Sequence, residues 1–258
     1  MKVIAQRHLP HMPWMNPITA RMPGIQPVAP GDWLRVDEAF APQMGERDRL
    51  IRDHRDAVHA LLPPARDAAR ELLDMVLDQL PSLGHRIDPG VVTRPDGVTV
   101  AINRDAPLLT LGRLVQEDFV IHLPQEREHA MMGAILCFPA SWTLAEKIGQ
   151  PLTRIHRPVP EYDGNLAARV QRLFDAVRPE QPLWRANALL YEDPALHQPR
   201  REGEIRPRPV SRDWLRSERQ CLVRLPVSRA VVFSIHTTIV HVDDVDPDAL
   251  AAFRAVHP

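Results

Sequence analysis

The chain has 258 residues, of which 44% are hydrophobic and 25% are charged, and its formal net charge at pH 7 is −1. This is the composition of an ordinary globular protein, long enough for one large domain or two small ones. A charge so close to zero excludes a whole-protein field that would attract nucleic acid or an anionic membrane. Since no run approaches the roughly 20 apolar residues of a membrane span, we expect neither nucleic-acid nor membrane partners.

The two cysteines and the N-terminus indicate the compartment. Cys137 and Cys221 lie inside apolar runs, so we expect buried thiols in a reducing environment. Two cysteines are also too few for an iron–sulfur cluster, which takes about four. Pro10 and Pro13 interrupt the apolar stretch that a signal peptide needs. The expected location is therefore the cytoplasm.

Proline placement predicts how the chain begins. Residues 1–31 contain six prolines among few periodic apolar positions, which indicates an extended N-terminal arm. We expect a single α+β domain over residues 32–258. From 47 to 80 apolar residues recur at helical spacing, and Pro63 and Pro64 are expected to split this run into a pair of helices.

The remaining elements alternate between strands and helices. VVTRPDGVTVAI at 91–102 predicts a hairpin, because its Pro-Asp-Gly turn lies between two β-branched runs. Apolar runs predict strands at 118–123, 130–138, 184–191, 220–226 and 230–240, and helical spacing predicts helices near 107–115, 142–149, 163–177 and 246–255. The predicted fold class is α+β, with a mainly antiparallel sheet and flanking helices. Residues 193–213 carry five arginines and no apolar periodicity, which favours a long loop that serves as a lid or docking surface.

Most of the candidate chemistry lies between residues 112 and 160. This segment contains, in order, the runs QED, FPASW, EKIG and IHRPVP, and the run SERQCLVRLP follows at 217–226. Their shared order resembles the heme-dependent oxidative N-demethylase alpha-subunit family. The resemblance implies a PAS-like sheet that holds heme b, activates O2 at the iron and oxidises a small alkylamine to a demethylated amine and formaldehyde. Because this chain has neither a nicotinamide-binding motif nor cluster cysteines, the resemblance also implies a separate flavin and iron–sulfur reductase subunit.

The resemblance makes His156 the candidate metal ligand. The IHRPVP run implies that its imidazole binds the heme iron, while Arg154 and Arg157 pair with the propionates. Spacing alone favours a capping or surface histidine, and only the resemblance to the family makes ligation an equal alternative. His122 and His236 lie in predicted strands and compete for the same role, although related sequences tend to carry Arg where His236 stands.

Three further cations are candidate cofactor-binding residues by the same resemblance: Lys147, Arg219 and Arg224. Lys147 is one of only two lysines among 32 basic residues, so it points to a position where a compact ammonium suits better than a planar guanidinium. A solvated helix lysine is the alternative.

The candidate catalytic residues are Glu117 and Glu218. A carboxylate on a pocket wall can bind an amine as its ammonium form or relay protons to bound oxygen, although Glu117 also fits a solvated helix end. Glu218 and Arg219 are strand neighbours, so we expect their side chains on opposite faces. Ala188 follows Asn187 where the family carries Trp; if it lines the pocket, the substrate range should differ from dimethylamine.

Three functions are compatible with this sequence. The first is a heme-dependent oxidative N-demethylase-like monooxygenase that uses a small alkylamine, O2 and externally supplied electrons. The alternative is a non-catalytic PAS-like sensor module that binds heme or a small ligand, because a fold does not decide function. A family member that has lost heme and kept a scaffold role is the third possibility.

Overall fold

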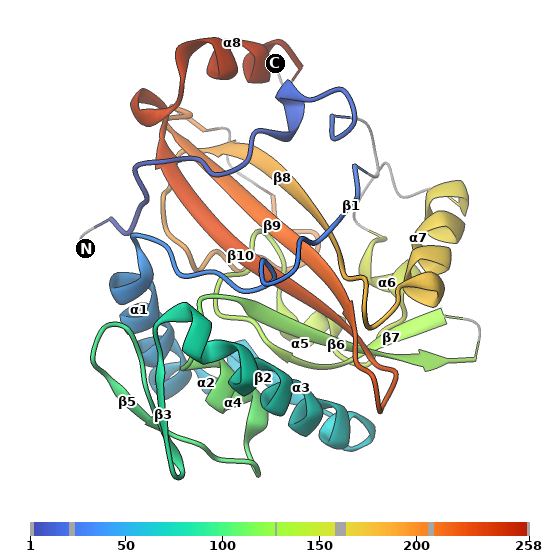
Figure 1. The fold of residues 1–258 in the computed structure, drawn as a ribbon. Coiled ribbons are helices and arrows are strands. Elements are labelled where there is room, and N and C mark those ends of the chain that lie inside the picture. The colour runs from blue at the N-terminus through green and yellow to red at the C-terminus, as the bar shows by residue number, and fades with distance from the viewer. Residues whose placement is uncertain (1–2, 21–23, 127, 158–163, 206–208, 257–258) are drawn as a thin grey trace.

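A computed structural model describes residues 3–20, 24–126, 128–157, 164–205 and 209–256 of the chain. Its centre is a seven-stranded antiparallel sheet with the spatial order β1-β8-β9-β10-β6-β7-β2 (Figure 1). The strands are β1 (Gln26–Pro27), β2 (His59–Leu61), β6 (Asp118–Gln125), β7 (Glu128–Ile135), β8 (Leu183–Tyr191), β9 (Trp214–Arg224) and β10 (Val231–His241). A smaller antiparallel sheet contains β3 (Arg86–Asp88), β4 (Val91–Thr93) and β5 (Thr99–Ala101).

Helices lie on both sides of the large sheet (Figure 1). They are α1 (Phe40–Asp53), α2 (Arg55–Val58), α3 (Arg66–Gln79), α4 (Pro107–Gly112), α5 (Leu144–Lys147), α6 (Leu152–Ile155), α7 (Gly164–Ala176) and α8 (Pro247–Val256). Single 3₁₀ turns occur at Pro13–Met15, Pro63–Ala65, Leu80–Leu83 and Val242–Asp244. The predicted α+β class with a mainly antiparallel sheet is confirmed, while its likeness to PAS domains stays a prediction.

The sheet has two buried faces, which β9 defines by its alternation. The front face carries Cys221 and Val223, which belong to one apolar core with α3 side chains such as Leu72. The back face carries Leu222, which packs with Leu152 of α6 and with side chains of α7. Both faces are therefore covered, and a site on either one is bounded by a different set of helices.

The predicted hairpin is present, but the predicted pair of helices is interrupted by a strand. β4 and β5 pair across a turn in which Gly97 has a φ of +83°, as the Pro-Asp-Gly sequence indicates. Residues 59–61, however, form β2 and pair with the outer edge of β7, and Leu62 N–H donates to the Met132 carbonyl. Apolar spacing reports side-chain faces and carries no information about this distant backbone partner, so it predicts a helix there.

Strand β9 begins at Trp214, six residues earlier than position 220, where the sequence predicts its start. The added part contains Arg216, Glu218 and the buried Arg219. Arg216 and Arg219 are buried and Glu218 is half-buried, and all three are held by ion pairs and hydrogen bonds, as described below. Apolar alternation, which is the usual signal of a half-buried strand, is therefore missing from this part of the sequence.

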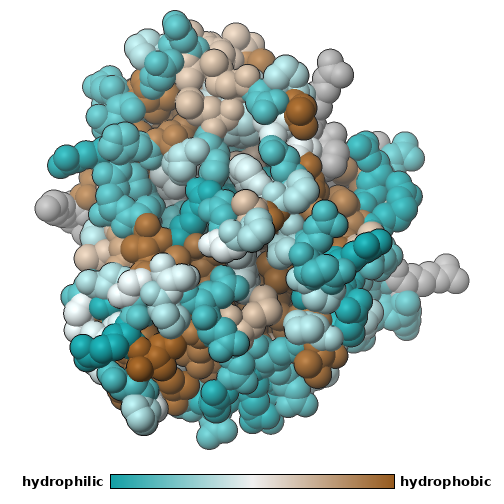
Figure 2. All heavy atoms as spheres, in the orientation of Figure 1, coloured by the Kyte–Doolittle hydropathy of each residue, from teal (hydrophilic) through white to brown (hydrophobic). Residues whose placement is uncertain are grey.

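The described N-terminal residues and residues 192–205 lie on opposite faces of the sheet. Gln6 N–H donates to the Ile239 carbonyl at 2.8 Å, and the Trp14 ring packs edge-on against Phe253 of α8. The first described segment passes in front of the sheet in Figure 1. Figure 2 shows the same side of the molecule, on which small hydrophobic groups are scattered among hydrophilic ones. None of the helices in the described ranges has the length and apolar character that a membrane crossing requires.

Candidate functional site

The two candidate carboxylates lie on opposite faces of the sheet. On β9, Glu218 is paired with Thr237 and Arg219 with His236, and successive strand side chains point to opposite sides. Glu117 accepts a hydrogen bond from His236 Nδ1 at 3.0 Å, so it belongs with Arg219 on the front face. A single pocket therefore contains either Glu117 or Glu218.

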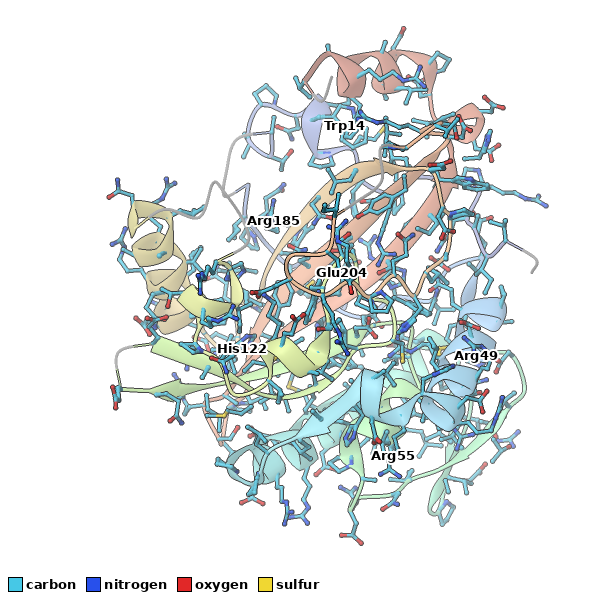
Figure 3. The ribbon with its side chains drawn as sticks, turned by 180° about the vertical axis from the view of Figure 1, so that it is seen from behind. Trp14, Arg49, Arg55, His122, Arg185 and Glu204 are labelled. Carbon is cyan, nitrogen blue, oxygen red and sulfur yellow. The ribbon has the colours of Figure 1, made fainter. Side chains whose placement is uncertain are left out.

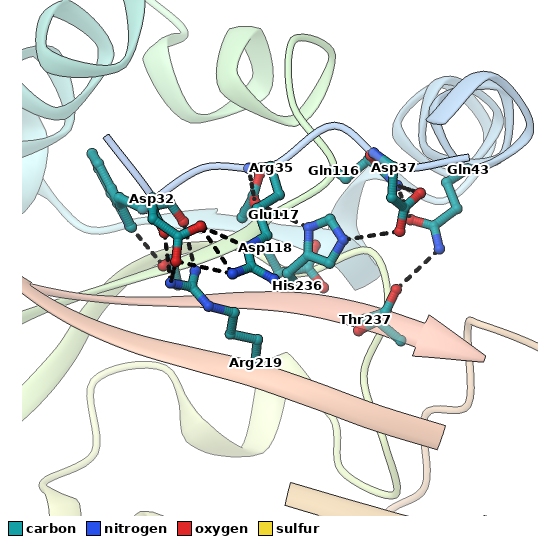
Figure 4. Close-up of polar contacts among 12 residues, drawn as sticks. Asp32, Arg35, Asp37, Gln43, Gln116, Glu117, Asp118, Arg219, His236 and Thr237 are labelled. Atoms are coloured by element: carbon teal, nitrogen blue, oxygen red, sulfur yellow. Dashed lines mark hydrogen bonds and ion pairs between the residues drawn. The ribbon is translucent and has the colours of Figure 1, made fainter. Parts of the chain in front are cut away.

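On the front face, His236 bridges two carboxylates (Figure 4). Its Nδ1 lies 3.0 Å from Glu117 Oε1 and its Nε2 lies 3.1 Å from Asp37 Oδ2. Burial alone would lower the pKa of His236, but the hydrogen bonds to Asp37 and Glu117 raise it to about 9. Burial would raise the pKa of Asp37, yet the bond from His236 brings it down to about 2. The arrangement is a buried imidazolium between two carboxylates.

The rest of the front-face cluster attaches residues 32–37 to the sheet. Glu117 Oε1 also accepts the Arg35 backbone N–H, and Asp32 pairs with the guanidinium groups of both Arg35 and Arg219. Arg219 donates to the Trp33 carbonyl at 2.9 Å. A pocket of about 360 Å³ borders this cluster, but its arginines are already paired with carboxylates of the chain. The roles predicted for Glu117 as a catalytic residue and for Arg219 as a cofactor-binding residue would both require a ligand bound on this front face.

On the back face, His156 follows the last residue of α6. Its Nδ1 lies 2.9 Å from the carbonyl oxygen of Leu152. A carbonyl only accepts, so Nδ1 carries the hydrogen and Nε2 carries the lone pair. Burial lowers the pKa of His156, which keeps the ring neutral. This is the protonation state and tautomer that a metal-ligating histidine needs.

The surface near His156 is apolar and only partly covered. Trp142, Ile155 and Phe233 are partly buried and pack against the buried side chains of Val120 and Ile235. A flat apolar group could lie against these side chains, and water would then be excluded from the group and from the side chains. A neutral histidine next to partly buried apolar side chains would suit a heme, with His156 as the residue that would hold the iron.

His122 is the competing histidine on this face. Its ring packs edge-on against Phe174 at 5.2 Å, and its Nδ1 has no hydrogen-bond partner among the described residues. Burial lowers the pKa of His122 to about 3, with smaller contributions from His129 and His156. His122 is thus neutral as well, but packing alone holds its Nδ1 side.

The candidate cations near His156 have partners of their own. Lys147 Nζ and Arg154 lie 2.7 and 2.8 Å from the same Glu202 oxygen. Hydrogen bonds from Arg154 and then Lys147 lower the pKa of Glu202 to about 2. Arg224 donates to the carbonyls of Val177 and Phe174 at the C-terminal end of α7, where a cation is favourable.

Arg157 is exposed, and the run at 158–160 lies outside the described residues. The sequence did not indicate Glu202. It stands in a stretch with no apolar periodicity and is recognisable only through its two cationic partners.

Glu218 lies in a polar group on the back face. It accepts from Arg216 and Gln220 at 3.2 Å each, and its own N–H donates to Asn187. Arg185 lies on the same face, 3.2 Å from Gln220, and burial lowers its pKa. Figure 3 shows this face, with the loop that carries Glu204 crossing the sheet and Arg185 and His122 to one side. A carboxylate of low exposure can bind a cationic ligand.

Ala188 does not line this face. Asn187 points back, and Ala188 packs on the front with Leu215 and Phe253, while Trp14 covers the same cluster. Strand alternation separates the two neighbours. The Trp-to-Ala difference therefore changes the front-face core beside α8.

The described residues contain no group of three or more His, Cys, Asp or Glu side chains that could hold a metal ion. Comparison with protein families gives one match. A family model described as "haem-dependent oxidative N-demethylase, alpha subunit-like" matches residues 24–256, which is nearly the whole chain. The chain therefore belongs to the heme-dependent oxidative N-demethylase alpha subunit-like family.

Proposed function

We propose that this protein is a heme-dependent monooxygenase that removes a methyl group from a small alkylamine, with heme b bound on the back face of the sheet. The observation that carries the proposal is His156, a neutral histidine whose Nδ1–H is fixed on the Leu152 carbonyl beside a partly exposed apolar surface. Family membership supports the heme. Bound heme would supply the activation of O2.

The chain's own residues would hold the cofactor and the substrate. His156 Nε2 would ligate the iron, and the apolar side chains around Ile235 would pack on the macrocycle and exclude water. Arg157, which is exposed, is the cation that would meet a propionate. Lys147, Arg154 and Arg224 support the surrounding backbone, because each already binds a carboxylate or a carbonyl.

Glu218 would bind the amine. Its carboxylate lies on the back face, and only 12% of its side chain is exposed, so an alkylammonium could donate N–H to it away from bulk water. Register places Glu218 level with Thr237 and His122 level with Val231, about 20 Å apart at 3.4 Å per residue. Glu218 and the region of His122 thus mark two ends of one extended surface.

Electrons would come from a separate reductase, which the resemblance gives as a flavin and iron–sulfur protein. One oxygen atom of O2 would end in formaldehyde and the other in water. The chain's contribution would be to hold the amine and the cofactor on the same face of the sheet.

The test is turnover by heme-loaded protein. Reduced protein supplied with O2 and dimethylamine should form formaldehyde, and Glu218→Gln should lower this yield at equal heme content. Omission of the reductant is the control. An amine-induced spectral change without formaldehyde would favour the sensor module, and no heme binding at all would favour a scaffold.

A further inference from the structure

Lys147 is buried beside the segment that carries His156. Only 3% of the residue is exposed, and its Nζ donates to the Ile155 carbonyl and to Glu202, both at 2.7 Å. Ile155 directly precedes His156, so the ammonium holds the peptide unit that leads into the candidate ligand. The lysine that stands out in an arginine-rich sequence is thereby explained, since a compact ammonium fits between a carbonyl and a carboxylate.

Glu202 joins both sides of this segment. One oxygen, Oε1, accepts from Lys147 of α5 and from Arg154 of α6. The Glu202 backbone N–H donates to the Glu146 carboxylate at 3.1 Å. The side chain and the backbone of Glu202 thus hold α5 and α6 together.

The loop that carries Glu202 is itself anchored. Gln198 N–H donates to the Pro139 carbonyl at 3.1 Å, and Ser141 N–H donates to the Gln198 carbonyl at 2.9 Å. The carboxylate therefore extends from a fixed backbone. A surface ion pair usually contributes little, but here one partner is a nearly buried ammonium that would lose its counter-charge.

We propose that Glu202 is a positioning residue that orients His156 through Lys147 and Arg154. The inference rests on the proposed function for the role of His156. The set of contacts that Glu202 makes with Lys147 and Arg154, called here the Glu202 clamp, is independent of heme. Loss of the Glu202 charge should free the α6 segment and widen the range of orientations of the imidazole.

The first test uses heme-free protein. Glu202→Gln should raise the amide exchange rate of peptides covering 152–157 by about tenfold, because the hydrogen bonds from Lys147 and Arg154 lose their charged acceptor. Glu204→Gln is the matched control, because Glu204 is an exposed residue of the same loop whose carboxylate meets the Arg201 backbone N–H. Equal exchange in the two variants would overturn the clamp, as would global unfolding of Glu202→Gln, since the proposed effect is local.

The second test uses heme-loaded protein. Glu202→Gln should show a mixed axial-ligand spectrum that added imidazole restores, while Glu204→Gln keeps the wild-type spectrum. Lys147→Met should reproduce the Glu202→Gln spectrum, and the double variant should be no worse than either alone. If wild type takes up no heme, the proposed function fails while the exchange result stands; if wild type binds heme and Glu202→Gln is indistinguishable from it, the positioning role fails alone.

Discussion

Two histidines of this protein show how partners decide the role of a residue. His236 meets a carboxylate at each ring nitrogen and carries a charge, whereas His156 meets a backbone carbonyl at Nδ1 and is neutral. In sequence each is a histidine next to an isoleucine. The buried imidazolium suits a structural tie, and the neutral imidazole suits a metal ligand.

His236 should make stability depend on pH. Its pKa rises from 6.5 unfolded to about 9 folded, so the folded state binds the extra proton between these values and stability falls as pH rises. We expect the free energy of unfolding, measured with urea, to drop on the order of 2 kcal/mol more in wild type than in His236→Gln between pH 6 and 9.

The exposed His8 provides the control for this measurement, and His8→Gln should keep the wild-type slope. The contribution of Asp37 runs the other way: it is present above pH 3.8 and lost as pH falls through about 2. A wild-type stability that rises toward pH 9 would contradict the charged state assigned to His236.

At the scale of elements, strand β9 determines which candidate residues can act together. Its alternation separates Glu218 from Arg219, as the sequence predicted, and the antiparallel register assigns Glu117 to the side of Arg219. The assignment of Glu117 to the face of Arg219 depends on the pairing of β10 with both β9 and β6. No local pattern specifies that pairing, so the sequence alone could not decide between the two carboxylates.

The two glutamates should therefore behave differently. Glu218→Gln should weaken amine binding to the heme-loaded protein by roughly 1.5–3 kcal/mol, the contribution of a charged hydrogen bond, and should also lower thermal stability, because the buried Arg216 loses its carboxylate partner. Glu117→Gln should lower stability and leave amine binding intact, because it removes a partner of His236. Amine-induced spectral titrations with thermal melts measure both, and the opposite pattern would place the amine on the front face.

Gly112 shows how closely α4 packs on the sheet. A Cβ at this position would lie 2.6 Å from Ile135 Cγ1 and 2.9 Å from Ile51 Cδ1. Gly112→Ala should cost about 1–3 kcal/mol of unfolding free energy through overpacking. Gly45→Ala in α1 is the control: a Cβ there would meet nothing within 4 Å, and we expect it to stabilise by about 0.5–1 kcal/mol. Equal effects of the two substitutions in denaturant titrations would refute this packing.

At the scale of the whole molecule, the sheet divides a structural face from a candidate site. The front carries the large core and the imidazolium tie, and the back carries His156, Glu218 and the Glu202 clamp. The sequence predicted the fold class, the hairpin and the strands at 118–123, 184–191 and 230–240 because their apolar runs are clear. It could not predict β2, the early start of β9 or Glu202, because distant backbone and charge partners determine them.

The measurement that tests the account most directly is the absorption spectrum of protein reconstituted with heme. Wild type should show a strong near-ultraviolet heme band that shifts on reduction and on CO binding. His156→Ala should lose heme, or give a spectrum that added imidazole restores by occupying the vacated position, while His122→Ala and His236→Ala keep the native spectrum. A native axial-histidine spectrum in His156→Ala, together with its loss in His122→Ala, would contradict the account and make the strand histidine the ligand.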